Sequence, residues 1–243
     1  SLIVVTVLNR ATEVVLDGLT ITSGNGEGGS VAPNMTASAG LKLVASALTV
    51  RNCTFEKNTG AKGAALYDTS AGTTLRVENT IFKDNVSHGG GAMHVAGSYV
   101  IESCTFYNNQ SKDSPYGYQW GGGLFLGQSS TGTVNNCVFA NNYAVEAGGG
   151  VCNVGTATIT NSTFYGNSIS VGPHSGDNGG TSIWSHIGST NMKNCIIWAT
   201  NGGSSVVYNI HGGSTTITYS LIEGGHAGTG NISADPQFVT TAN

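Results

Sequence analysis

Residues 82–93 have the sequence Phe-Lys-Asp-Asn-Val-Ser-His-Gly-Gly-Gly-Ala-Met, a Phe-x-x-Asn motif followed after three residues by a glycine tract. The same frame continues with Ile at positions 21, 197 and 222, so the repeated position occurs eight times, about 24 to 34 residues apart. A repeat of this length that runs from end to end indicates a solenoid of about eight units. The full motif occurs five times, at Phe55/Asn58, Phe82/Asn85, Phe106/Asn109, Phe139/Asn142 and Phe164/Asn167.

The residues around the repeated position form columns. Five residues before it every unit has an apolar side chain, and two residues before it the side chain is mostly small. Side chains of a straight strand alternate between two faces, so these positions cannot all point inward unless the chain bends between them. Asn tolerates left-handed geometry, so we expect a bend or bulge at the position between these two columns. That position holds Asn in five units: Asn52, Asn79, Asn136, Asn161 and Asn194.

Glycine tracts such as Gly90-Gly91-Ala92-Met93 mark the start of a second strand in the repeat. Parallel crossovers are overwhelmingly right-handed, so strand, turn and strand in each unit predict an all-β, right-handed parallel β-helix of about eight coils. At about 4.8 Å per coil the rod would be roughly 35 to 40 Å long. A β-propeller is the alternative, but its blades need about 40 residues.

Composition agrees with a single elongated domain over residues 1–243. The chain is 39% hydrophobic, 9% charged and contains 37 Gly, which is too apolar for disorder and too rich in Gly for a helical fold. The net charge of −4 and the scattered Lys and Arg argue against nucleic acid as a partner. No apolar run approaches the roughly 18 residues of a membrane span. The first residues read as a strand and not as a signal peptide, so we expect a segment of a larger exported protein.

The pairing of Phe-x-x-Asn with Gly-Gly-Ala and an apolar residue, over about residues 45 to 170, resembles the repeat of the chlamydial polymorphic outer membrane proteins. This resemblance implies a parallel β-helix passenger displayed by autotransport and used in adhesion. The stretch from Asn194 to Val239, with Asp235-Pro236-Gln237-Phe238, is similar to large secreted bacterial β-helix proteins that carry choice-of-anchor segments. Residues 15–21 resemble the coil that often opens the repeat run of those proteins. We expect the barrel or anchoring tail of these families to lie outside residues 1–243, which leaves the mode of attachment open.

The columns of cysteine and asparagine residues could have a functional or a structural role. Cys53, Cys104, Cys137 and Cys195 share one column, and Cys152 follows a glycine tract. No pair has the two-to-four-residue spacing of metal sites, so we expect buried free thiols, with a Cys104–Cys137 disulfide as the alternative. The Asn columns are interpreted as amide ladders along the solenoid. Six sequons occur, at Asn34, Asn52, Asn85, Asn109, Asn161 and Asn231, and several are by-products of the repeat.

Catalysis on a β-helix would need aligned carboxylates, or a carboxylate-bound Ca²⁺. Glu78 and Glu102 align four residues before the repeated position in consecutive coils, and Arg51 has the same offset. We interpret this set as a solvated outward stripe with an Arg51–Glu78 pair. No cofactor is expected, and Ca²⁺ is the one alternative considered.

Three insertions leave the repeat at the same point: residues 23–39, 110–120 and 168–180. They should decorate one edge of the solenoid, where functional loops on a rigid scaffold are common. Aromatic faces with short polar groups are suited to sugar rings or partner loops, although they can also pack a loop onto its coil. The candidate ligand-binding residues are Tyr107, Asp113, Tyr116, Tyr118, Trp120, Tyr143, His174 and Asp177.

The sequence therefore predicts an extracellular or cell-surface module that acts in adhesion or carbohydrate binding, without catalysis. Its expected partner is a polysaccharide or a surface protein of a host or neighbouring cell. The alternatives are a polysaccharide lyase or glycoside hydrolase, and a stalk or filament subunit that self-associates through coil ends such as residues 2–7. Ice binding by Thr rows is set aside, because Arg76, Val100 and Asn191 interrupt them.

Overall fold

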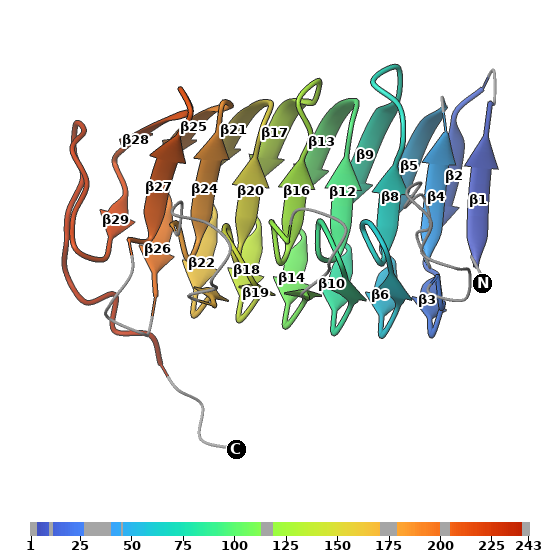
Figure 1. Cartoon of the computed structure of the whole chain (residues 1–243), viewed down its shortest axis with the longest axis horizontal. Coiled ribbons are helices and arrows are strands. Elements are labelled where there is room, and N and C mark those ends of the chain that lie inside the picture. Colours follow the sequence, from blue (N-terminus) through green and yellow to red (C-terminus); the bar gives the residue numbers. More distant parts are fainter. Residues whose placement is uncertain are drawn as a thin grey trace.

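The computed structural model describes residues 4–9, 12–26, 40–44, 46–112, 119–170, 179–199 and 205–239. In this part of the chain 29 strands and no helices occur, and every strand pair is parallel. The strands stack as coils along one long axis (Figure 1). The predicted parallel β-helix is confirmed.

Three sheets of eight strands and one of five strands run along the axis. We name them from Figure 1 as the front, rear, lower and corner sheets. A coil passes through the rear, lower, corner and front sheets in that order. The sequence predicts two strands for each coil. The further strands arise because the chain bends again after the lower-sheet strand and once more after the corner-sheet strand, before it reaches the front sheet.

The front sheet contains β1 (Val5–Leu8), β4 (Leu41–Val44), β8 (Leu66–Asp68), β12 (Met93–Val95), β16 (Leu124–Leu126), β20 (Val151–Asn153), β24 (Ile183–His186) and β27 (Val207–Ile210). The rear sheet contains β2 (Val14–Asp17), β5 (Ala47–Arg51), β9 (Thr74–Glu78), β13 (Ser98–Glu102), β17 (Thr131–Asn135), β21 (Thr156–Thr160), β25 (Ser189–Lys193) and β28 (Ser214–Thr218).

The lower sheet contains β3 (Thr20–Thr22), β6 (Thr54–Glu56), β10 (Ile81–Lys83), β14 (Thr105–Tyr107), β18 (Val138–Ala140), β22 (Thr163–Tyr165), β26 (Ile196–Trp198) and β29 (Leu221–Ile222). The corner sheet contains β7 (Thr59–Gly60), β11 (Val86–Ser87), β15 (Gln110–Ser111), β19 (Tyr143–Ala144) and β23 (Ser168–Ile169).

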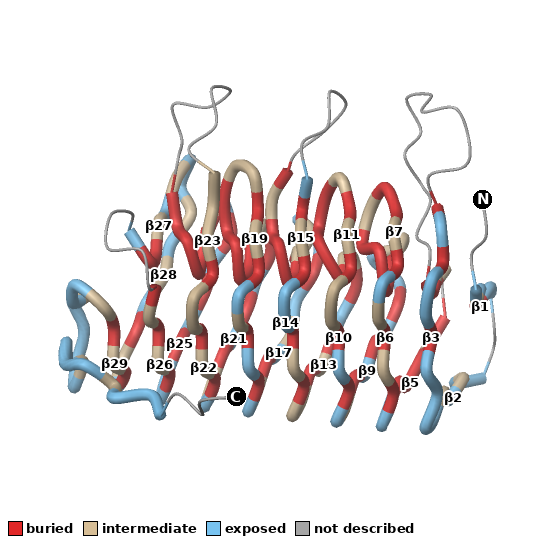
Figure 2. The backbone as a smooth tube through the Cα atoms, turned by 90° about the horizontal axis from the view of Figure 1, so that it is seen from below, coloured by how far each residue is buried: buried red, intermediate tan, exposed pale blue. Residues whose placement is uncertain are grey.

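The repeated position lies in the lower sheet and faces the core. Its eight residues pair in register from Ile21 to Ile222, and all are buried. The five Phe rings stack with centroids 4.6 to 5.1 Å apart and planes within 11° of parallel. Figure 2 shows buried residues in every coil along the length of the stack. The repeat in the sequence therefore coincides with the structural repeat of one coil.

The expected bend before the repeated position is present in all eight coils. Each residue there has a positive φ, between 46° and 70°. This left-handed conformation turns the chain from the rear sheet into the lower sheet and brings the apolar columns on both sides of it into the core. The eight residues are Gly18, Asn52, Asn79, Ser103, Asn136, Asn161, Asn194 and Tyr219.

The Asn of the Phe-x-x-Asn motif forms a buried ladder. Asn109 donates from Nδ2 to Phe82 O (2.9 Å) and to Asn142 Oδ1 (3.0 Å). Its own Oδ1 accepts from the backbone N–H of Asn85 (3.1 Å) and from Asn85 Nδ2 (3.0 Å). The same pattern links Asn58 to Asn167, so these amides satisfy the backbone at a buried corner. The structural interpretation of this column is confirmed.

The small-residue column is a second ladder. The backbone N–H of Cys104 donates to Cys137 Sγ (3.4 Å), and that of Cys137 donates to Ser162 Oγ (3.1 Å). All five cysteines are buried and free, as predicted. Burial raises the pKa of Cys195 to about 11.

The two ends of the stack differ. At the C-terminal end Ile222 N–H donates to Ile232 O and Ile232 N–H donates to Ser220 O, both 2.9 Å, so residues 223–232 close the last coil. The Phe238 ring then contacts Tyr165 at 4.8 Å. In the first coil, by contrast, the core residues Val14 and Leu16 are only half-buried.

Candidate functional site

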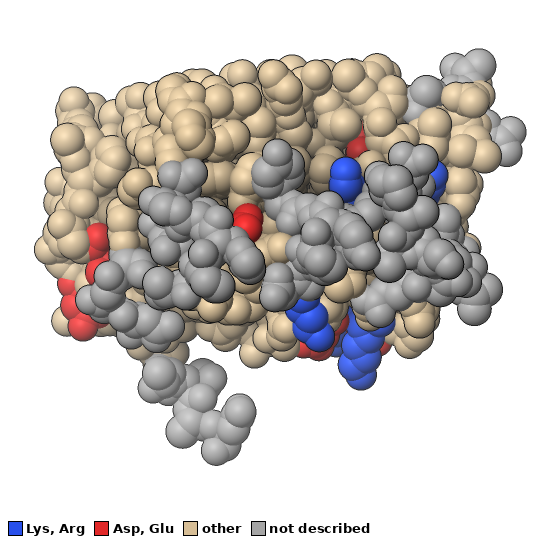
Figure 3. All heavy atoms as spheres, in the orientation of Figure 1, with Lys and Arg blue, Asp and Glu red and all other residues tan. Residues whose placement is uncertain are grey.

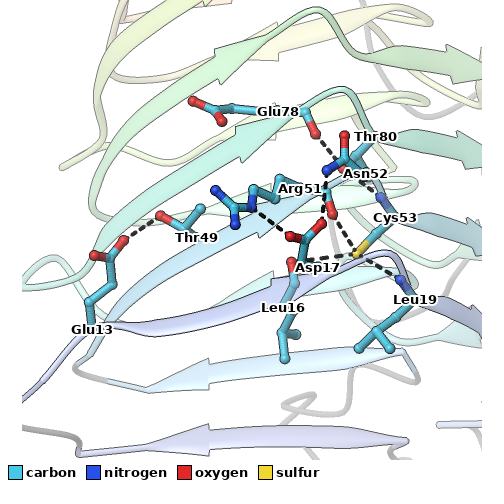
Figure 4. A network of polar contacts seen from close by, with 10 residues as sticks. All are labelled: Glu13, Leu16, Asp17, Leu19, Thr49, Arg51, Asn52, Cys53, Glu78 and Thr80. Atoms are coloured by element: carbon cyan, nitrogen blue, oxygen red, sulfur yellow. Dashed lines mark hydrogen bonds and ion pairs between the residues drawn. The ribbon is translucent and has the colours of Figure 1, made fainter.

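The charged stripe on the rear sheet matches its predicted alignment but not its predicted pairing. Asp17, Arg51, Glu78 and Glu102 are register partners in consecutive coils. Arg51 Nε lies 2.9 Å from Asp17 Oδ2, as Figure 4 shows. Hydrogen bonds from Asn52 and from Arg51 lower the pKa of Asp17.

The expected Arg51–Glu78 pair is therefore wrong. Arg76, two residues before Glu78 on the same outward face, binds the Glu78 carboxylate instead, and its Nη2 lies 3.6 Å from Glu102 Oε2. Both glutamates thus share one cation on an exposed face. Among the described residues no group of three or more His, Cys, Asp or Glu side chains is placed to hold a metal ion.

The three insertions leave the solenoid at one corner, as predicted. Each departs directly after a residue that is hydrogen-bonded to the neighbouring coil beside the corner sheet, and each rejoins ahead of a front-sheet strand. These last hydrogen bonds run from Gly26 to Thr59 (2.7 Å), from Lys112 to Ser87 (2.7 Å) and from Ser170 to Ala144 (3.0 Å).

The eight predicted site residues divide into two groups. Tyr107 is 45% exposed on β14 of the lower sheet, Tyr143 is half-buried on β19 of the corner sheet, and Trp120 precedes β16 of the front sheet. These three stand on different sheets. The other five lie outside the described residues: Asp113, Tyr116, Tyr118, His174 and Asp177.

Trp120 belongs to a set of aromatic side chains on the outer face of the front sheet. One column of register partners there runs through β8, β12, β16, β20, β24 and β27. Neighbouring rings in it touch, with centroids 5.0 Å apart for Tyr67 and His94 and 4.6 Å apart for His94 and Phe125. We call the whole set the aromatic strip: Tyr67, His94, Trp120, Phe125, Trp184, His186, Tyr208 and His211.

Trp120 lies at the centre of this strip. Its ring centroid is 4.6 Å from Trp184, 5.1 Å from His186 and 6.3 Å from Phe125. Trp184 and His186 stack at 4.9 Å with planes 17° apart. The rings pack on Cys152 and Ala147 and form a second hydrophobic cluster, separate from the core inside the coils. The prediction that loop aromatics pack onto the coil thus applies to Trp120.

The side chains of the strip differ in their exposure to solvent and in their polarity. Trp184 is only 2% exposed, whereas Trp120, Phe125 and Tyr208 are half-buried and offer part of their rings to solvent. Burial, with the charge of Lys62 as a smaller cause, lowers the pKa of His94 to about 3, so this imidazole is neutral near pH 7. Trp184 Nε1 is buried and has no hydrogen-bond partner.

Sequence reasoning missed most of the strip, although a signal was present. Each glycine tract is followed by an inward apolar residue and then by an outward one, as in Leu124-Phe125, Ile183-Trp184 and Val207-Tyr208. Reading that outward column through successive repeats would have aligned the rings.

Parallel strands in stacked coils, a buried Phe column and an amide ladder at each turn define a parallel β-helix protein with an aromatic outer face. Residues 7–240 match the family model described as right-handed β-helix region, and the chain belongs to this family. No curated protein and no solved structure matches the chain. Within the described segments no helix has the length and apolar character needed to cross a membrane.

Proposed function

We propose that this chain is a carbohydrate-binding module of an exported surface protein and that the aromatic strip is its binding face. The observation that carries the proposal is the contact of Trp120 with Trp184, His186 and Phe125 on the outside of the front sheet. Trp120 and Phe125 come from one coil, and Trp184 and His186 come from the coil two steps further along, so a rigid scaffold holds the rings in place.

Physical chemistry supports a ligand of this class. Binding sites for small ligands and sugars combine aromatic surfaces with a few placed polar groups. The half-buried rings of Trp120, Phe125 and Tyr208 supply the surface. The Trp184 indole N–H supplies a donor that has no protein acceptor, and an unsatisfied buried donor costs about 1–3 kcal/mol. A sugar oxygen that reached this N–H would remove the cost.

The cellular role follows from the resemblance and not from the geometry. Repeats similar to those of the polymorphic outer membrane proteins and the choice-of-anchor proteins favour display at the cell surface. The function in that setting is adhesion to a polysaccharide of a host or neighbouring cell. The aligned carboxylates of Glu78 and Glu102 lie on the rear sheet, whereas the aromatic strip lies on the front sheet, so they are not parts of one site.

The test compares glycan binding by the wild type and two variants. Trp120→Ala should weaken binding at least tenfold, or about 1.4 kcal/mol, in a titration against glycans selected from an array. Tyr107→Ala removes an exposed aromatic side chain from another sheet and should leave affinity unchanged. Circular dichroism establishes that both variants fold, and Trp120→Phe retains a ring should Trp120→Ala prove unstable. Equal affinity of Trp120→Ala and wild type would overturn the proposal.

A further inference from the structure

The aromatic strip has a direction and a charge character that restrict its ligand. We infer that it accepts an uncharged, unbranched glycan whose chain lies parallel to the solenoid axis across several coils. This inference rests on the proposed function.

The direction follows from strand register. The column from Tyr67 to Tyr208 crosses six consecutive strands of the front sheet, which is about 24 Å at 4.8 Å per coil. Positions beside the column in the middle coils are small, among them Ala96, Gly127 and Ala147. Of this column, His94, Phe125 and Tyr208 are partly exposed, whereas Tyr67, Cys152 and Trp184 are buried. The three partly exposed rings span four coil steps, about 19 Å. A ligand that contacts all three must therefore lie along the axis.

The charge character follows from the side chains between Phe125 and Tyr208. The outward positions of β16, β20, β24 and β27 hold aromatic, aliphatic or cysteine side chains together with His186, and no Lys, Arg, Asp or Glu. Figure 3 shows few charged atoms among the described part of this face. Each uronate residue would bring a carboxylate against these rings, and desolvating a charge without a partner is strongly unfavourable.

The described charges nearest to the segment between Phe125 and Tyr208 do not supply that partner, and Lys42, the register partner of Tyr67, lies three coils from Phe125. Lys62 occupies the same position in its coil as Trp120 but two coils away, which is about 10 Å and comparable with the screening length in physiological salt. Glu146 is half-buried and its Oε2 accepts the Gln119 N–H at 3.4 Å, so it would repel an acidic sugar. Local charge thus favours a neutral ligand.

An unpartnered donor within the strip suits a hydroxyl-rich chain. Trp184 Nε1 is buried, has no hydrogen-bond partner and belongs to a ring that contacts the half-buried Trp120 ring. The indole N–H can only donate, and the hydroxyl and ring oxygens of a sugar can accept without a formal charge.

The experiment screens a glycan array that holds neutral and acidic members and then titrates matched oligosaccharides of two to eight units. The matched pairs share linkage and length, such as β-1,4-linked glucose against β-1,4-linked glucuronate. We expect neutral members to bind at least tenfold more tightly than acidic partners. Affinity should rise at least tenfold between two and six units and then level off. Raising NaCl from 50 to 500 mM should change neutral binding less than twofold.

Each outcome has a separate meaning. Tighter binding of the acidic series, or loss of binding in Lys62→Ala, overturns the inference while the proposed function stands. Affinity that does not depend on length beyond two units overturns the axial orientation. Absence of binding to every array member overturns the proposed function itself. Trp184→Phe keeps an apolar ring but removes the N–H, so it should weaken neutral binding about fivefold, and Tyr107→Ala should not.

Discussion

The Asn ladder makes a quantitative prediction for Asn109→Ala. The substitution removes four hydrogen bonds: two donated by Nδ2, and two accepted by Oδ1 from Asn85. Asn85 Nδ2 keeps its bond to Phe55 O, and Asn142 Oδ1 keeps the bond from the Asn109 backbone N–H. The buried N–H of Asn85 loses its acceptor, which costs about 1–3 kcal/mol, and Phe82 O loses one donor, which costs about 1 kcal/mol.

The expected loss is therefore about 2–4 kcal/mol in the free energy of unfolding, out of about 5–15 kcal/mol for a typical domain. Urea denaturation followed by circular dichroism measures it, and the melting temperature should fall by roughly 5–15 °C. The matched control is Asn191→Ala on the exposed face of β25, where we expect a change within about 0.5 kcal/mol. Equal destabilisation by the two variants would refute the ladder as a source of stability.

Three other perturbations test separate features of the fold. Gly91→Ala should destabilise the protein strongly in the urea assay, because φ is +33° and a Cβ would lie 1.6 Å from the Gly122 carbonyl oxygen. Gly72→Ala should be neutral or slightly stabilising, because a Cβ there has no contact closer than 3.7 Å. The pKa of His94 is lowered to about 3 in the folded protein, so the stability that neutral His94 contributes is fully present above about pH 6.5 and is lost as the pH falls toward 3. His94→Phe should therefore flatten the dependence of the urea midpoint on pH between 7 and 4. An unchanged slope would contradict this. Arg76→Ala should cost no more than about 1 kcal/mol, and the difference from wild type should shrink in high salt.

The columns of the sequence predicted most of the fold because each column has one physical role in every coil. Phe106 and Asn109 have equivalents in the neighbouring coils, so a packing requirement met once must be met again at each step. The bend is the clearest case: the positive φ also occurs at Ser103 and Tyr219, where the residue type alone does not favour it. The position in the repeat determines the backbone there more strongly than the residue does.

The charged stripe and the binding face were harder to predict, for different reasons. Arg51 has an acid in both adjacent coils, and offset alone cannot decide between Asp17 and Glu78; the choice depends on Arg76, which occupies Glu78 from within its own strand. Trp184 follows a glycine tract in a coil far from Trp120 in sequence, and only strand stacking brings the rings within 4.6 Å. Proximity across 64 residues depends on how many coils intervene and on their register.

The common departure point of the insertions has a further consequence for how such a chain can change. Units differ in length from 24 to 34 residues, yet Phe55, Phe82 and Phe106 remain in register, so additional residues are absorbed without displacing the coils. Length variation at this corner is thermodynamically inexpensive, since closing a longer loop costs little additional entropy. Recognition segments could therefore be exchanged one coil at a time while the scaffold stays unaltered. Each coil would offer one insertion point at this corner, and neighbouring insertion points would be one strand spacing apart.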